Sequence, residues 1–227
     1  IRGYNRYMAV PGEHHPAFEE YCETIFELRE DDLDVIQARI ADRLRVSRPS
    51  VSEMIKRMSD ESLIEVAGGK ITLTVTGEEL AVRVVRRHRI AERFITDILG
   101  LSWSLAHREA GRWEHVMSHE VETAMSRLLG EPTTCPHGNP IPGSGYTPPL
   151  AKKLSELSSG QEFTVSRIPE ELEFTPGMLE FLENSHLVPG SHGTVQIGAE
   201  AGDMTVLIDG TSVTVDSYAT ARILVTV

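Results

Sequence analysis

Hydrophobic side chains recur every three or four residues in three successive segments near the start of the chain, residues 16–29, 35–44 and 47–58. This spacing places each set on one face of an α-helix. The apolar positions are Phe18, Tyr21, Ile25 and Leu28; Ile36, Ile40 and Leu44; and Val51, Ile55 and Met58. Ser47 suits an N-cap and Pro49 is tolerated in a first helical turn. The pattern predicts three helices, with a tight turn between the last two.

A two-stranded hairpin is expected next. Residues 63–66 and 70–75 are rich in β-branched and apolar side chains and flank Gly68-Gly69, a common hairpin turn. Three helices followed by a small hairpin are typical of a winged helix-turn-helix.

Three longer helical segments follow the hairpin. Thr76-Gly77-Glu78-Glu79 reads as a capping box that opens a helix to about residue 97. Ser102 or Ser104 could cap a second helix to about residue 117. Ser118 could cap a third that ends near Gly130.

Residues 131–150 hold six prolines and three glycines and are expected to form a linker. Short β-like runs follow at 163–168, 194–197, 204–208, 212–215 and 223–227, with one helical stretch at 178–184. Close strand spacing predicts a small barrel. The expected fold is mainly α with small β parts. We expect a winged helix-turn-helix domain at 13–76, a helical domain at 77–143, and a linker with the small barrel at 144–227; the resemblance described below implies that the second is a dimerization and metal-binding domain and the third an SH3-like domain.

The net charge of −12 is unfavourable for a DNA-binding protein, but its distribution is uneven. Residues 36–95 carry twelve basic and eight acidic side chains, a net +4, between acidic flanks. A local basic surface is compatible with DNA binding. No apolar run approaches the roughly 18 residues of a membrane span. Two distant cysteines form no disulfide framework, and we expect a cytoplasmic protein.

Histidine and glutamate side chains share helical faces in three of the predicted helices. Four residues separate His88 from Glu92, three separate Glu20 from Glu23, and Glu114 and His115 share a stripe with His107. If the helices converge, imidazoles and carboxylates would form a ligand set for Mn²⁺, Fe²⁺, Co²⁺, Ni²⁺ or Zn²⁺. The simpler interpretation is a solvated surface pair on each helix. The candidate metal ligands are Glu20, Glu23, His88, Glu92, His107, Glu114 and His115.

The third helix is the candidate DNA-reading helix, because small hydroxyls and cations cluster at its start and on its polar face. The candidate DNA-binding residues are Ser47, Arg48, Pro49, Ser50, Ser52 and Lys56. Glu53 would repel phosphate unless it accepts a hydrogen bond from a cytosine amine. A solvated helix face is the alternative interpretation.

From about residue 19 to residue 143 the sequence resembles the diphtheria toxin repressor family, the iron- and manganese-dependent repressors. The segments that carry the resemblance are residues 38–41 with 47–52, 85–93, 107–118 and 138–143. The resemblance implies a dimeric, metal-activated repressor of operator DNA, not an enzyme, with two metal sites per subunit and an SH3-like C-terminal domain.

The resemblance also implies which residues would bind each of the two metal ions. One site of the iron-type branch would use His88, Glu92 and His107. The other would use Glu114 and His115, with a methionine at the position of Glu20 and a cysteine at that of Gly111. The manganese-type branch has two carboxylates in the first helix, which Glu20 and Glu23 match. That branch usually has a glutamate at the position that Gly111 occupies here.

Carboxylates in place of sulfur favour Mn²⁺ over Fe²⁺. In some family members the SH3-like domain supplies ligands. Thr175 and Met178 fall at those places here, and Glu170, Glu171 or Glu173 could substitute. Cys22 is expected in the core.

The expected function is repression of metal-homeostasis genes by the metal-loaded dimer. Two other classes stay open: a metal-dependent hydrolase, and a winged-helix regulator that senses an organic ligand.

Overall fold

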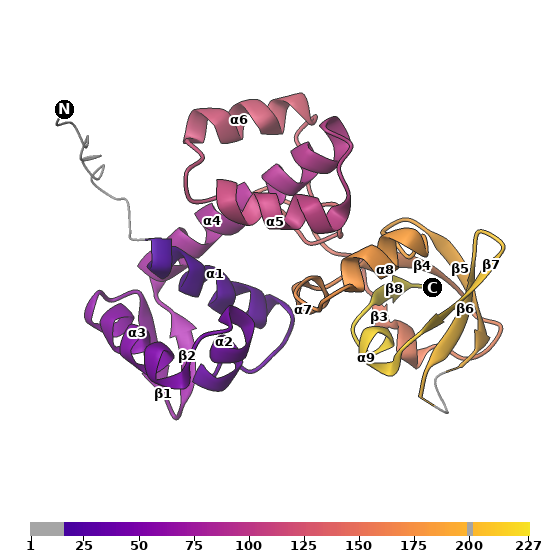
Figure 1. The fold of residues 1–227 in the computed structure, drawn as a ribbon, viewed down its shortest axis with the longest axis horizontal. Helices are drawn as coiled ribbons and strands as arrows, with labels where there is room; N and C mark the ends of the chain where they lie inside the picture. Colours follow the sequence, from indigo (N-terminus) through magenta and orange to yellow (C-terminus); the bar gives the residue numbers. More distant parts are fainter. Residues whose placement is uncertain (1–15, 199–201) are drawn as a thin grey trace, which may run out of the picture.

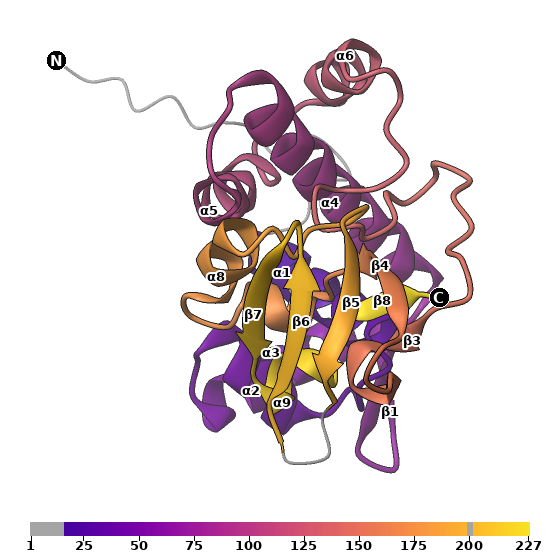
Figure 2. The ribbon, with the colours of Figure 1, turned by 90° about the vertical axis from the view of Figure 1, so that its right-hand side faces the viewer.

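The computed structural model describes residues 16–198 and 202–227, and the predicted domain start at residue 13 lies outside them. Three regions follow one another along the chain (Figure 1). An N-terminal helical domain with a hairpin is joined to a second helical region. A linker then leads to a C-terminal domain whose sheet faces the viewer in Figure 2.

The N-terminal domain has the predicted winged helix-turn-helix arrangement. Its elements are α1 (Pro16–Glu30), α2 (Gln37–Leu44), α3 (Arg48–Asp60), β1 (Ile64–Ala67) and β2 (Lys70–Leu73). The predicted apolar stripes form one core, in which Ile40, Val51 and Met58 are completely buried. Cys22 is buried there as expected, and burial raises the pKa of its thiol to about 12.

Two local signals in this domain act as predicted. Ser47 caps α3, and its side chain accepts a hydrogen bond from the Ser50 amide over 3.2 Å. Gly68 and Gly69 both have positive φ and connect β1 to β2 in a two-residue turn, with Ala67 opposite Lys70.

The second region consists of α4 (Val75–Arg93), the π-helical η1 (Phe94–Ile98), α5 (Trp103–Trp113) and α6 (His119–Leu128). The predicted capping box at Thr76 is wrong. Thr74 is the N-cap: its hydroxyl accepts from the Gly77 amide over 3.1 Å and donates to the Ser62 carbonyl over 2.7 Å. Ser102 and Ser118 stand at the N-caps of α5 and α6.

Residues 131–150 contain no helix or regular strand, as predicted for a linker. Beyond them come β3 (Lys152–Lys153), the 3-10 turn η2 (Leu154–Glu156), β4 (Glu162–Arg167), α7 (Glu170–Glu173), α8 (Met178–Asn184), β5 (His192–Ile197), β6 (Met204–Ile208), β7 (Thr211–Val215), α9 (Ser217–Thr220) and β8 (Leu224–Thr226). In the described residues the strands form one antiparallel sheet in the order β3-β8-β4-β5-β6-β7. Strand β3 and helices α7 and α9 were not predicted.

None of the helices in the described ranges combines the length and apolar character that a membrane crossing requires.

Candidate metal centre

Helix α4 packs against both α1 and α5 (Figure 1), and the predicted metal ligands lie on these three helices and directly after α5. All seven predicted side chains belong to overlapping clusters whose ligand atoms lie within 4.8 Å of one another. These clusters are Glu20, Glu114 and His115; Glu23, His88 and Glu114; and His88, Glu92 and His107. Three helices distant in sequence therefore contribute to a single centre.

The first donor group joins α1 to the end of α5. His115 Nδ1 lies 2.7 Å from Glu19 Oε2, and its Nε2 lies 3.0 Å from Glu20 Oε1 and 3.2 Å from Glu114 Oε1. Burial lowers the pKa of His115, but the hydrogen bonds to Glu19 and Glu20 outweigh it and raise the pKa to about 10. Glu19 is an additional neighbour that the sequence did not single out.

His88 links this group to the interior of the centre. Its Nδ1 lies 2.5 Å from Glu114 Oε2 and 4.0 Å from Glu23 Oε1, whereas its Nε2 lies 3.1 Å from Glu92 Oε1. Burial opposes the charged imidazole, yet Glu92 and Glu114 hold the pKa of His88 well above its usual value. These two carboxylates therefore favour the charged form of His88.

The second donor group is completed by α5. His107 Nδ1 lies 3.0 Å from Glu92 Oε1 and 3.3 Å from His88 Nε2. Burial lowers the pKa of His107, but hydrogen bonds to Glu173 and Glu92 raise it to about 9. Glu92 is completely buried, so its charge is balanced by these imidazoles and not by water.

A third donor group comes from the linker and α7, and sequence reasoning missed most of it. His137 Nδ1 lies 2.8 Å from Glu173 Oε2 and 3.6 Å from Glu92 Oε2, and Cys135 Sγ lies 3.8 Å from the same nitrogen. Glu92, Cys135 and His137 form a completely buried cluster of potential ligands. The available signal was Cys135-Pro-His137, a thiol and an imidazole two positions apart in a segment taken as a plain linker.

The C-terminal domain reaches the centre through Glu173, whose Oε2 lies 3.2 Å from His107 Nδ1. Of the three glutamates considered as substitutes, Glu170 also enters a cluster with these two residues, whereas Glu171 does not. Thr175 instead donates a hydrogen bond to the Glu171 carbonyl, and Met178 is buried in the C-terminal core.

The donor set fits a divalent cation. Glu23 Oε1, Glu92 Oε2 and His137 Nε2 are buried without a hydrogen-bond partner in the part of the chain that is described. Burial, followed by the charge of Glu114, raises the pKa of Glu23 well above its usual value. Unpaired buried oxygen atoms are costly, and coordination of Glu23 Oε1 and Glu92 Oε2 to cations would satisfy them.

Gly111, one turn before His115, has open space beside it. A methyl group built on it would meet no atom within 4 Å among the described residues. The position where the family usually has a side-chain ligand therefore has room for one.

The candidate DNA-reading helix presents its polar residues to solvent. Ser47, Arg48, Pro49, Ser50, Ser52 and Lys56 are all exposed, while Val51 and Ile55 face the core. The hydroxyl of Ser47 is already used in the cap.

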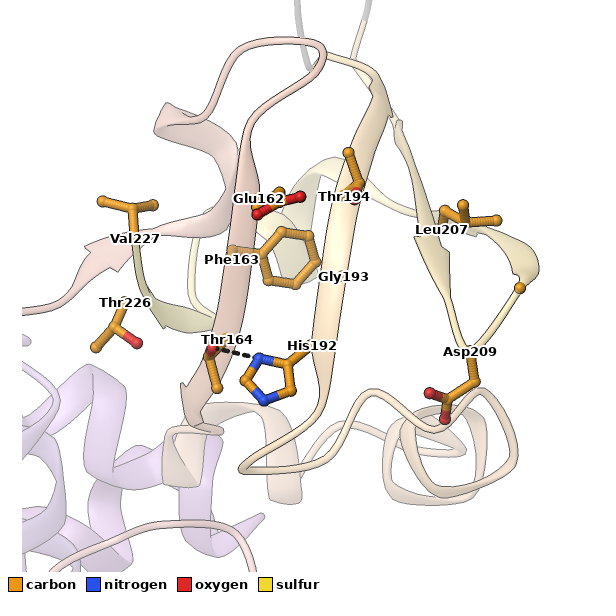
Figure 3. A pocket seen from close by; sticks show the side chains of 11 residues that line it. Glu162, Phe163, Thr164, His192, Gly193, Thr194, Leu207, Asp209, Thr226 and Val227 are labelled. Atoms are coloured by element: carbon orange, nitrogen blue, oxygen red, sulfur yellow. Dashed lines mark hydrogen bonds between the residues drawn. The ribbon is translucent and has the colours of Figure 1, made fainter.

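A separate cavity of about 590 Å³ lies on the C-terminal sheet and has no metal-ligand cluster. Figure 3 shows His192 hydrogen-bonded to Thr164, with Glu162 and Asp209 set apart from it along the pocket. These acidic side chains do not converge on the imidazole, so the cavity lacks the chemistry of the helical centre.

Comparison with known proteins accounts for all three regions. The family profile "Iron dependent repressor, N-terminal DNA binding domain" matches residues 15–70, and "Iron dependent repressor, metal binding and dimerisation domain" matches residues 74–143. A FeoA domain profile matches residues 152–227.

Individual proteins agree with the profiles. The iron-dependent repressor IdeR of Mycobacterium leprae is 38% identical over 204 residues, covering 85% of this chain and 88% of the relative. The diphtheria toxin repressor of Corynebacterium diphtheriae is 48% identical over 126 residues, covering 55% and 56% of the two chains. The solved structure of a manganese-dependent transcriptional repressor in complex with manganese matches with a TM-score of 0.82 at 32% identity, covering 92% of this chain and 99% of that one.

The predicted winged helix-turn-helix, helical metal-binding region and SH3-like domain are thereby confirmed. The chain belongs to the iron-dependent or diphtheria toxin repressor family and is a metal-dependent transcriptional repressor.

Proposed function

We propose that this repressor binds operator DNA as a homodimer in the cytoplasm when a divalent metal occupies its helical centre, with Mn²⁺ preferred over Fe²⁺. The observation that carries the proposal is the convergence of carboxylates and imidazoles from α1, α4 and the end of α5, where Glu23 Oε1 and Glu92 Oε2 are buried without a hydrogen-bond partner in the described part of the chain.

Two metal sites per subunit are proposed. Glu20, Glu23, Glu114 and His115 would hold one ion, and His88, Glu92 and His107 the other. Cys135, His137 and Glu173 extend the second region. A bound divalent cation supplies positive charge and coordination bonds. Oxygen and nitrogen donors dominate both sets, which suits Mn²⁺, whereas Cys135 offers a softer ligand on one side only.

The carboxylates of the centre explain how metal could control DNA binding. Glu20 and Glu23 project from α1, a helix of the DNA-binding domain, toward Glu114 and His115 at the end of α5. In the metal-free protein His115 offsets part of the charge of Glu20 and Glu114, but burial and the charge of Glu114 disfavour an ionised Glu23, so these carboxylates are not fully neutralised. Neutralising them favours the approach and fixes the spacing of two reading heads on a two-fold operator.

The DNA interface is proposed to be the exposed face of α3, with Arg48, Ser50, Ser52 and Lys56 in contact with the major groove or its phosphates and Ser47 and Pro49 shaping the start of the helix. Dimerization would cover apolar side chains exposed on the helical region. They include Val116, Val121 and Leu128, and Val116 is 81% exposed in the single chain.

The test is operator binding measured by fluorescence anisotropy against buffered free Mn²⁺, Fe²⁺ and Zn²⁺ under anaerobic conditions. The DNA is a duplex enriched from a random library by the Mn²⁺-loaded wild-type protein. We expect His88→Ala and Glu114→Ala to abolish the metal response. His192→Ala, which alters an exposed histidine outside the centre, should leave it unchanged.

A wild-type response to metal in the His88→Ala and Glu114→Ala variants would refute the assigned centre. DNA binding that persists after chelation favours a sensor of an organic ligand. Metal-dependent cleavage of a generic ester or phosphoester without DNA binding favours a hydrolase.

A further inference from the structure

Helix α7 is a single turn that touches three parts of the molecule with three glutamates. Glu173 faces His107 and His137 in the metal centre. Glu170 accepts a hydrogen bond from Arg89 of α4 over 2.9 Å. Figure 1 shows α7 between the N-terminal domain and the C-terminal sheet. The remaining glutamate points to the DNA-binding domain.

Glu171 pairs with Arg43 of α2, the first helix of the helix-turn-helix. The Arg43 guanidinium lies 3.0 Å from Glu171 Oε2 and 3.1 Å from Glu27 Oε2, and 4.4 Å from the centre of the Phe174 ring. The Arg43 side chain is only 4% exposed. One buried cation therefore joins α1, α2 and the segment around α7.

Asp31, directly after α1, provides a second bridge. Its Oδ1 accepts from Arg167 of β4 over 2.6 Å, and its Oδ2 accepts from the Glu171 amide over 3.0 Å. The Asp31 side chain is only 2% exposed. Charged groups so shielded from water are sensitive to the loss of a partner. We call Asp31, Arg43, Arg167 and Glu171 the α7 clamp.

We propose that the α7 clamp transmits metal occupancy from Glu173 to the DNA-reading head, and that Arg43 and Glu171 are positioning residues for operator binding. The inference rests on the proposed function and adds a route separate from the ligands on α1. Glu171 and Glu173 share one helical turn, so a contact that fixes Glu173 also fixes the carboxylate and amide of Glu171. The coupling is reciprocal: the clamp must strengthen metal binding by the factor by which metal strengthens the clamp.

Glu171→Gln is the informative variant, because Glu171 is 21% exposed and Arg43 keeps its pair with Glu27. Glu156→Gln, on an exposed part of the C-terminal domain, is the matched control. Full-length proteins are compared for operator affinity at saturating Mn²⁺, for Mn²⁺ affinity without DNA, and for Mn²⁺-induced hydrogen-exchange protection of α2.

We expect Glu171→Gln to weaken operator binding and Mn²⁺ binding by up to about five-fold each, the range of a partly exposed ion pair. It should also lose most of the Mn²⁺-induced protection of α2. Glu171→Asp, which keeps the charge, should recover part of both effects, and Glu156→Gln should match the wild type.

Wild-type affinity and α2 protection in Glu171→Gln would overturn the clamp. A lower melting temperature with no other change would do the same, because it indicates a merely structural role. If the wild-type protein shows no metal-dependent DNA binding, the proposed function fails. The exchange of α2 with and without Mn²⁺ then still decides whether the clamp exists.

Discussion

Metal loading should displace protons from imidazoles that are charged in the metal-free protein. Coordination requires a neutral ring nitrogen, whereas the pKa values of His107 and His115 are raised to about 9 and about 10 by their carboxylate neighbours. The pKa of His88 is also raised well above its usual value. At pH 7 the rings of His107 and His115 therefore carry a proton that the incoming ion must replace, and the raised pKa of His88 favours the same for that ring.

The size of the effect follows from these pKa values. Each displaced proton makes the apparent metal affinity rise about tenfold per pH unit until the pH reaches the pKa of the ring. The site with His115 should therefore gain about tenfold per unit up to about pH 10. The site with His107 should gain about tenfold per unit from this ring up to about pH 9, and the raised pKa of His88 adds to the slope. Unperturbed histidines would give a plateau above about pH 6.5.

Calorimetric titration with Mn²⁺ in two buffers of different ionisation enthalpy measures the protons directly. We expect about two protons per subunit at pH 7 from His107 and His115, further protons from His88 and Glu23, whose pKa values are also raised, and about one proton fewer in His115→Gln. The control His192→Ala should match the wild type. A flat affinity between about pH 7 and 9, with less than one proton released, would refute the reasoning.

Four further outcomes are expected. Without metal, the raised pKa values of His107 and His115 stabilise the fold fully below about pH 6.5 and progressively less through about pH 9 to 10, so chelated protein should unfold at lower urea at high pH than at pH 7. Gly111→Ala should stabilise α5 by up to about 1 kcal/mol in urea unfolding. Gly111→Glu should in addition bind Mn²⁺ about tenfold more tightly than Gly111→Ala, equivalent to about 1.4 kcal/mol. Equal Mn²⁺ affinities of the two variants would mean that position 111 lies outside the coordination sphere. Cys135→Ser should weaken Zn²⁺ more than Mn²⁺ in competition titrations, and equal losses would argue against a thiolate ligand. Lys56→Ala should weaken operator binding at unchanged metal affinity. The slope of log binding constant against log salt concentration should fall in magnitude by about 0.9 for each lost phosphate contact. An unchanged slope would argue against a contact between Lys56 and phosphate.

Local signals accounted for much of the fold. Ser47, Ser118 and the Gly68-Gly69 turn act within a few residues of themselves, so the sequence was sufficient to predict them. The start of α4 was misplaced because the segment offers two threonines. Thr74, and not Thr76, is the cap, and its hydroxyl also binds the Ser62 carbonyl across the domain, a contact no local pattern contains.

In the metal centre, too, local sequence patterns predicted some of the residues and missed others. His88 and Glu92 share a face on one helix, so the residues of each stripe could be predicted from spacing, and the structure brings the stripes together. Cys135 and His137 lie in a segment without helical or strand periodicity. Their burial depends on packing, with the His137 ring 4.5 Å from the Trp103 ring and its carbonyl bonded to the Ile168 amide. Sequence spacing carries no information on such contacts.

Glu92 presents one oxygen to the imidazoles of His88 and His107 and the other to His137. The His88–His107 pair and the Cys135–His137 pair thus share one carboxylate, so a change at Glu92 affects both pairs. A substitution of His107 or Cys135 would change the donor atoms of one pair, whereas a substitution of Glu92 would remove a donor that both pairs share. A change in metal preference would therefore require substitutions of the other donor residues, with Glu92 kept.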